Sequence, residues 1–179
     1  MPSVKIYAEH RDILDALITS KKVASVGGAT KTGPFSTQID AYVFAASIAM
    51  ASNMPTATDN MPKAKNATPI EEDVVLRAFG ARELCFTATL KEEGSDESLT
   101  DSLNRQLRTL ADRDFTSLFQ NLDRYAHAGF SWLAKHQEDE SSIRDLVLAA
   151  IDQIECVESN ITDASGVRDP LLDMLDMQV

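Results

Sequence analysis

Three histidines are the first residues in this sequence that could do chemistry. They are His10, His127 and His136, and no two of them have the HxxxH or HExxH spacing with which one helix presents two imidazoles to a zinc ion. The two cysteines, Cys85 and Cys156, lie far apart and also lack metal-site spacing. We therefore expect no metal and no cofactor, and we expect both cysteines to be reduced and buried as small apolar side chains.

A second kind of chemistry would use carboxylates with an imidazole. Asp123, Arg124 and His127 could lie along one side of a helix, but no nucleophile motif such as GxSxG accompanies them. We interpret His127 as an exposed or partly buried helix residue. The sequence leaves open an enzyme whose site gathers distant residues such as Asp40, Glu83 and His127, but nothing in the pattern nominates one. The expectation is a protein that is not an enzyme.

The glycine-rich segment GGATKTG, residues 27–33, has the composition of a phosphate-binding loop. That loop requires a glycine, four further residues and then Gly-Lys-Ser/Thr. Here Lys31 follows Thr30, and Ser25 stands where the first glycine is required, so both defining glycines are missing. We expect a flexible connection and no nucleotide.

Four arginines form a modest basic set that could contact nucleic acid: Arg105, Arg108, Arg113 and Arg124. They alternate with aspartates, which is typical of a solvated surface crossed by ion pairs. The formal net charge is −11. That charge disfavours broad DNA binding, because such binding depends on an excess of Lys and Arg. A DNA-binding or regulatory helical module that uses this arginine strip is the alternative function.

The negative charge is concentrated at the C-terminal end. Residues 138–179 hold eleven Asp or Glu against two Arg, a net of −9, and the first 137 residues therefore carry −2. This asymmetry favours a partner with a basic surface, or solubility alone. We expect a helical domain over residues 1–158 and an acidic tail over 159–179 with a short amphipathic segment. The apolar residues that would bind a partner are Leu171, Leu172, Met174, Leu175 and Met177.

The segment that positions most of these residues is GPFSTQIDAYVFAASIAMA, residues 33–51. Ser36 or Thr37 is a good N-cap, and the helix that follows is apolar nearly all round, which is typical of the central helix of a bundle. Its longest apolar run is too short for the ~20 residues of a membrane span. We therefore interpret the segment as core rather than as an exposed groove, in a cytoplasmic protein that does not use a membrane.

The remaining pattern predicts a mainly α protein, a compact bundle of five to seven helices. Residues 4–7 could form one short strand, and residues 9–22 show a helical apolar face. Residues 52–69 should form a long irregular loop, since they contain three prolines. The other expected helices cover about 71–79 (helix or strand), 82–92, 98–111, a long stretch after Asp114 and a last helix capped by Ser141 or Ser142. Gly129 inside the long stretch suggests a close helix contact.

Two of these helices carry a resemblance to a known family. The first contains Gly33, Pro34, Phe35, Asp40, Phe44, Ala45 and Ala46, and the second contains Tyr125, Ala126, Gly129 and Phe130. Over roughly residues 5–155 this order resembles the small accessory proteins encoded with bacterial DNA-phosphorothioation (Dnd) and related anti-phage defence systems.

The resemblance implies a non-catalytic accessory or adaptor protein that acts through protein–protein contacts. Its partner would be a larger defence-system protein, such as a DNA-processing ATPase, helicase or nuclease, or a second copy of the chain. The family implies no catalytic residues, so none are assigned here.

Overall fold

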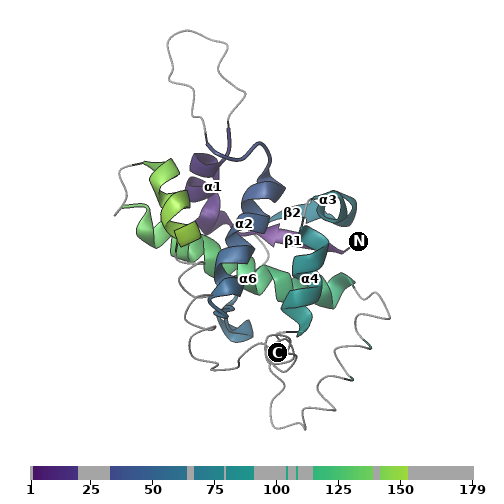
Figure 1. Ribbon diagram of the computed structural model, residues 1–179. Coiled ribbons are helices and arrows are strands. Elements are labelled where there is room, and N and C mark those ends of the chain that lie inside the picture. The colour runs from purple at the N-terminus through teal and green to yellow at the C-terminus, as the bar shows by residue number, and fades with distance from the viewer. Residues whose placement is uncertain are drawn as a thin grey trace, which may run out of the picture.

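A computed structural model describes residues 2–19, 33–63, 67–78, 80–90, 104, 108, 115–138 and 142–152. These residues are mainly helical, as the sequence predicts (Figure 1). Their buried apolar side chains form one core. The predicted acidic tail and its five partner-binding residues lie outside the described residues. So do Cys156 and, apart from residues 104 and 108, the predicted helix over 98–111.

The centre of the fold is the pair of helices α2 (Gln38–Ala51) and α6 (Phe115–His136), which cross each other in Figure 1. Helix α2 begins where the hydroxyl of Thr37 accepts a hydrogen bond from the Asp40 amide at 3.2 Å. Its alanines Ala41, Ala45 and Ala46 are fully buried, which confirms that this segment is core. Small side chains let α6 approach closely, because a Cβ on Gly129 would overlap the backbone carbonyl of Ala45.

The predicted N-terminal strand exists, but it has a partner that the sequence did not indicate. Strand β1 (Ser3–Ile6) pairs antiparallel with β2 (Thr68–Glu71), with Val4 opposite Ile70. The end of the predicted 52–69 loop is therefore extended and paired. The pattern hid this strand because Ile70 is the only one of its four residues that is buried, and because Pro69 is more typical of turns and sheet edges.

The first helix is shorter than the predicted 9–22. A 3-10 turn, η1 (Ala8–His10), leads into α1 (Arg11–Leu17), which ends at Leu17. Beyond it the backbone turns to pair with the segment before α2. The Phe35 amide donates to the Leu17 carbonyl at 3.0 Å, and the Thr19 amide donates to the Phe35 carbonyl at 2.8 Å. These backbone groups find partners across the chain instead of continuing the helix.

Three further helices complete the described bundle. They are α3 (Glu72–Arg77), α4 (Ala81–Leu90) and a helix over residues 143–152, which makes six α-helices among the described residues. Ser142 begins the last of them, where its hydroxyl accepts from the Asp145 amide at 3.2 Å. Cys85 on α4 is 2 % exposed, as expected for a small apolar side chain. Within the described part of the chain, no helix combines the length and apolar character that crossing a membrane requires.

Candidate functional site

A stripe of three polar residues, Asp123, His127 and Ser131, runs along one side of α6 at a spacing of four. Asp123 and His127 are buried, and Ser131 is exposed at the C-terminal end of the stripe. This side packs against β1 and η1, the N-terminal segment. Asp123 is 3 % exposed and His127 is 8 % exposed, so the expectation that His127 is an exposed or partly buried helix residue is wrong. The N-terminal segment covers it.

Two imidazoles and one carboxylate converge around His127, in the middle of this stripe. His10 Nε2 lies 2.6 Å from His127 Nδ1. Glu9 Oε1 lies 3.3 Å from His127 Nε2 and 3.6 Å from His10 Nε2. One ligand-type atom from each of Glu9, His10 and His127 therefore lies within 4.8 Å of the others. The imidazoles are buried and the Glu9 side chain is about half exposed, so the cluster opens toward solvent on the Glu9 side.

The hydrogen-bond network assigns the protons in this cluster. Burial, and then the neighbouring His127, lower the pKa of His10 to about 4, so His10 is a neutral imidazole at pH 7. His127 points Nε2 at the Glu9 carboxylate, which favours a proton on that nitrogen. His127 Nδ1 is then the acceptor, and His10 Nε2 donates to it. The arrangement is a three-member chain from His10 through His127 to Glu9.

Aromatic rings hold these imidazoles in place. The His10 ring stacks on Phe130 with centroids 5.3 Å apart and an interplanar angle of 24°. The Tyr7 ring lies against His127 with centroids 5.5 Å apart. Phe130 comes from the next turn of α6, and Tyr7 comes from the residue between β1 and η1. The rotamers of both histidines are therefore fixed by packing as well as by hydrogen bonds.

The N-terminal end of the stripe is built around the Asp123 carboxylate. Its Oδ1 accepts the Tyr42 hydroxyl at 2.6 Å and the Lys5 backbone amide at 2.8 Å. Burial raises the pKa of Asp123 to about 6, against the two hydrogen bonds and the Lys5 charge, which favour the ionised form. Burial, together with the nearby Asp123, also raises the pKa of Tyr42 well above its usual value. Asp123 therefore titrates close to neutral pH.

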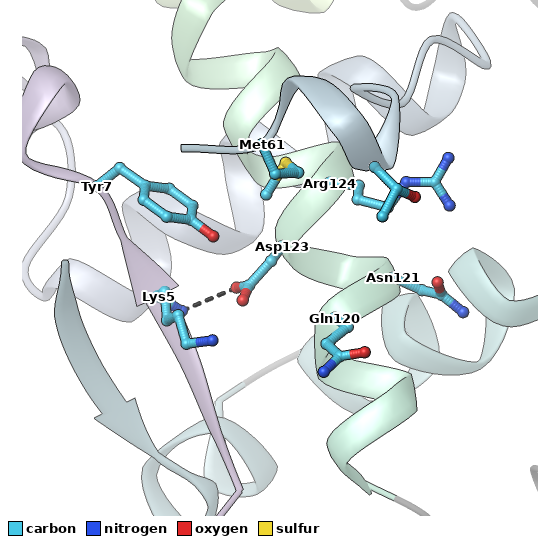
Figure 2. Close-up of a pocket in the computed structure, with 8 residues that line it drawn as sticks. Lys5, Tyr7, Met61, Gln120, Asn121, Asp123 and Arg124 are labelled. Carbon is cyan, nitrogen blue, oxygen red and sulfur yellow. Dashed lines mark hydrogen bonds between the residues drawn. The ribbon is translucent and has the colours of Figure 1, made fainter. Parts of the chain in front are cut away.

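A pocket of about 300 Å³ opens beside this carboxylate. It is lined by Lys5, Tyr7, Thr58, Met61, Gln120, Asn121, Asp123 and Arg124. Figure 2 shows the Asp123 carboxylate reaching from α6 toward β1, with the Tyr7 hydroxyl directed toward it from one side. The Lys5 side chain approaches from below, toward Gln120. Tyr7 borders both this pocket and His127, so the pocket and the histidine cluster adjoin.

The residues proposed from sequence for an assembled enzyme site do not gather. Asp40 lies at the start of α2, where its carboxylate accepts from the Ser36 hydroxyl at 3.1 Å. Glu83 is exposed in the first turn of α4. The contacts of His127 are instead with Glu9, His10 and the aromatic residues around them.

The arginine strip is described at two of its four positions. Arg108 is helical and exposed. The Arg124 Nε donates to the Thr56 carbonyl at 2.9 Å, so part of its guanidinium fastens the segment before η2 (Thr58–Asn60) to α6. Arg105 and Arg113 lie outside the described residues, and the nucleic-acid contact stays a prediction.

Sequence reasoning missed the Glu9–His10–His127 cluster because 117 positions separate the two histidines. One signal was present, since His127 repeats at the same four-residue spacing as the apolar residues of α6 that face inward. A titratable residue in an otherwise apolar stripe must find a buried partner, and a second histidine next to the first strand was the available one.

Compared with models of known protein families, with curated proteins and with solved structures, the chain matches none of them. Function is therefore inferred from the geometry of the site.

Proposed function

We propose that this protein binds a first-row transition-metal ion of the Zn²⁺ type through Glu9, His10 and His127. The observation that carries the proposal is the convergence of two buried imidazoles and one carboxylate within 4.8 Å. Imidazole nitrogen and carboxylate oxygen are the donors that zinc takes in His₂Glu sites. The neutral state of His10 also supports the proposal, because only a neutral imidazole can ligate a metal.

The separations support one ion with one atom from each residue. Zinc–ligand bonds of about 2.0–2.1 Å at tetrahedral angles place two ligand atoms roughly 3.3 Å apart. The observed separations from Glu9 Oε1 are 3.3 Å to His127 Nε2 and 3.6 Å to His10 Nε2. Both are close to the required value, and the ligand atoms of His10 and His127 lie within 4.8 Å of each other. Because a ligating nitrogen carries no proton, metal binding would move the protons off His10 Nε2 and His127 Nε2 and replace the hydrogen bond between His10 Nε2 and His127 Nδ1.

Ser131 offers the outer partner that such a site needs. A histidine that ligates through Nε2 carries its proton on Nδ1, and that proton is usually held by a hydrogen bond. The Ser131 hydroxyl lies 3.4 Å from His127 Nδ1, one turn further along α6. Three protein ligands leave a fourth position toward the exposed side of Glu9, which is the ligand count of open zinc sites rather than closed structural ones.

The test is a titration of the full chain with Co²⁺, followed by competition with Zn²⁺. We expect the visible bands of tetrahedral Co²⁺ with one ion per chain, and their displacement by Zn²⁺. His127→Ala and His10→Ala should abolish the bands, and Glu9→Gln should weaken binding by at least about tenfold. His136→Ala is the matched control, because this histidine lies on the same helix but stacks on Trp132, outside the cluster.

Two results would refute the metal site. One is the absence of Co²⁺ bands in the folded wild-type chain. The other is uptake by His127→Ala with wild-type affinity, which would place the ion elsewhere.

The accessory role implied by the resemblance is the second candidate function. The observation that favours it is a pair of exposed apolar residues, Leu148 and Ile151, at 48 % and 39 % exposure on the helix over 143–152. They lie one turn apart, and the acidic residues of 138–179 surround them in sequence. A larger DNA-processing protein with a basic surface fits this combination.

Deleting residues 167–179 and measuring co-purification with the products of neighbouring genes tests this second role. Loss of the partner would support docking through the tail. If the partner is retained by the deletion but lost with Leu148→Ser and Ile151→Ser, the helix is the docking surface. Retention in both variants would refute an adaptor that uses this end of the chain.

A further inference from the structure

The pocket beside Asp123 has the features of a small-molecule site that is separate from the metal cluster. Its volume of about 300 Å³ lies at the lower end of the range of ligand pockets, which suits a molecule of metabolite size. It lies between β1 and α6 and is bordered by the segment around η2, which contributes Thr58 and Met61 (Figure 2). Both α6 and β1 are packed elements, so the pocket walls are preformed.

The decisive group in this pocket is the second oxygen of Asp123. Both hydrogen bonds that described residues give this side chain end on Oδ1. Every buried side-chain oxygen and nitrogen among the described residues has a partner, so Oδ2 must reach accessible space, and the pocket is the space that Asp123 lines. A side chain that is 3 % exposed therefore directs one acceptor into the pocket. Such an acceptor binds a donor with positive charge best.

The opposite sign of charge is supplied from β1. The Lys5 side chain lines the same pocket, and its charge is close enough to favour the ionised form of Asp123. Gln120 and Asn121, on α6, line the same pocket with amide side chains (Figure 2). The pocket thus offers an acceptor at its base and a cation with amide donors at its side.

We infer that this pocket binds a small zwitterion, whose ammonium group contacts Asp123 Oδ2 and whose anionic group contacts Lys5. Free amino acids and their short ω-amino analogues belong to this class. The inference goes beyond metal binding, because none of the three metal ligands lines the pocket.

Isothermal titration calorimetry with three four-carbon probes separates the contribution of the ammonium group to binding from that of the carboxylate. The probes are 4-aminobutyrate with both charges, butylamine with the ammonium alone, and butyrate with the carboxylate alone. We expect 4-aminobutyrate to bind most tightly. Asp123→Asn should weaken 4-aminobutyrate and butylamine by at least about tenfold and leave butyrate unchanged. Lys5→Met should weaken 4-aminobutyrate and butyrate and leave butylamine unchanged.

The variants are chosen so that the fold survives. The amide oxygen of Asp123→Asn can accept the same two hydrogen bonds at the Oδ1 position, and Lys5 is only partly buried. Lys135→Met removes a charge from an exposed position of α6 and serves as the matched control. Amide NMR shifts of the wild-type chain give a second measurement, in which Lys5, Tyr7 and Gln120 should move on adding 4-aminobutyrate.

No binding of any probe by the wild-type chain, together with no shift at these three residues, overturns the proposal. So does equal affinity of 4-aminobutyrate and butylamine, since the anionic group would then contribute nothing. Unchanged 4-aminobutyrate affinity in Asp123→Asn would place the ligand away from this carboxylate.

Discussion

His10 Nε2 and His127 Nδ1 lie 2.6 Å apart, although 117 positions separate the two residues in the chain. Each imidazole gives the other the hydrogen-bond partner that burial requires. The pair therefore fastens the N-terminal segment to α6 at the point where Glu9 brings a carboxylate from the surface. A contact that holds two distant segments together should be visible in stability as well as in metal binding.

Replacing one member of this pair should destabilise the fold. His10→Ala removes the ring that stacks on Phe130 and leaves His127 Nδ1 with only the more distant Ser131 hydroxyl at 3.4 Å, at an expected cost of about 1–3 kcal/mol. Urea unfolding followed by circular dichroism measures this loss. His136→Ala should change the free energy of unfolding by less than about 0.5 kcal/mol, since it lies partly exposed at the end of α6.

A double-mutant cycle isolates the pair itself. If the two imidazoles stabilise each other, the loss in His10→Ala/His127→Ala should be smaller than the sum of the single losses by about 0.5–3 kcal/mol. Strict additivity would mean that the hydrogen bond contributes nothing beyond packing.

The crossing of α2 and α6 should not accept a single added methyl group. A Cβ at Gly129 would overlap the Ala45 backbone, so Gly129→Ala must push two central helices apart. Alanine gains about 1 kcal/mol of helix propensity over glycine, but overpacking costs about 1–3 kcal/mol or more, and here the neighbour is rigid backbone. We expect a net loss of stability, measured as a lower urea midpoint or as insoluble protein.

Gly80→Ala is the control for this prediction. Gly80 has a φ of +74° but open space around its Cβ position, so only backbone strain opposes the change. That strain costs about 1–2 kcal/mol. A Gly129→Ala variant as stable as wild type would mean that the two helices are not in this close contact.

Asp123 should make stability depend on pH in an unusual direction. Its pKa is raised from 3.8 to about 6 by burial, so the folded state disfavours the ionised carboxylate. This contribution to stability is fully present below pH 3.8 and is lost as the pH rises to about 6. The loss corresponds to about 3 kcal/mol. The titratable groups that couple to Asp123, besides the Lys5 cation, are Tyr7, Tyr42 and Cys85, and burial raises the pKa of each above its ordinary value, away from this window.

Asp123→Asn isolates this effect, because the amide does not ionise. We expect the variant to gain stability relative to wild type as the pH rises from 4 to 7, by up to about 3 kcal/mol. Urea unfolding at half-unit steps of pH gives the difference directly. A difference that stays constant across this range would show that Asp123 has an ordinary pKa.

The sequence predicted the elements well where local periodicity is strong. The all-round apolar pattern of residues 38–51 predicted a central helix, and Gly129 predicted the close contact that the structure places against Ala45. The prediction was wrong where tertiary partners decide the backbone. The helix expected over 9–22 stops at Leu17 because Phe35 offers backbone partners. Strand β2 exists because β1 pairs with it, not because of its own pattern.

The candidate site was predicted less well, for a related physical reason. A pair such as His10 and His127 leaves no mark at any fixed spacing, because two segments must first fold to bring them together. The burial of Asp123 leaves no mark either, because the alternation of aspartates with arginines in this part of the sequence is typical of a solvated surface. Residues at three- or four-residue spacing on the apolar face of a helix, including titratable ones, are better read as buried and in need of partners.

The hydrogen bond from Tyr42 to Asp123 gives a last prediction. Tyr42 is fully buried, and its hydroxyl donates to Oδ1 at 2.6 Å, which favours the ionised carboxylate. Tyr42→Phe removes only this donor and keeps the ring. The pKa of Asp123 should therefore rise above about 6.

At pH 7.5 the Tyr42→Phe variant should lose about 1.5–3 kcal/mol of unfolding free energy, the usual contribution of a hydrogen bond to a charged group. In the Asp123→Asn background the same substitution should cost only about 1 kcal/mol, because the acceptor is neutral. Carboxyl NMR titration measures the pKa, and urea unfolding of the four variants measures the coupling. An unchanged pKa together with equal losses in both backgrounds would mean that Tyr42 supports the core by packing alone.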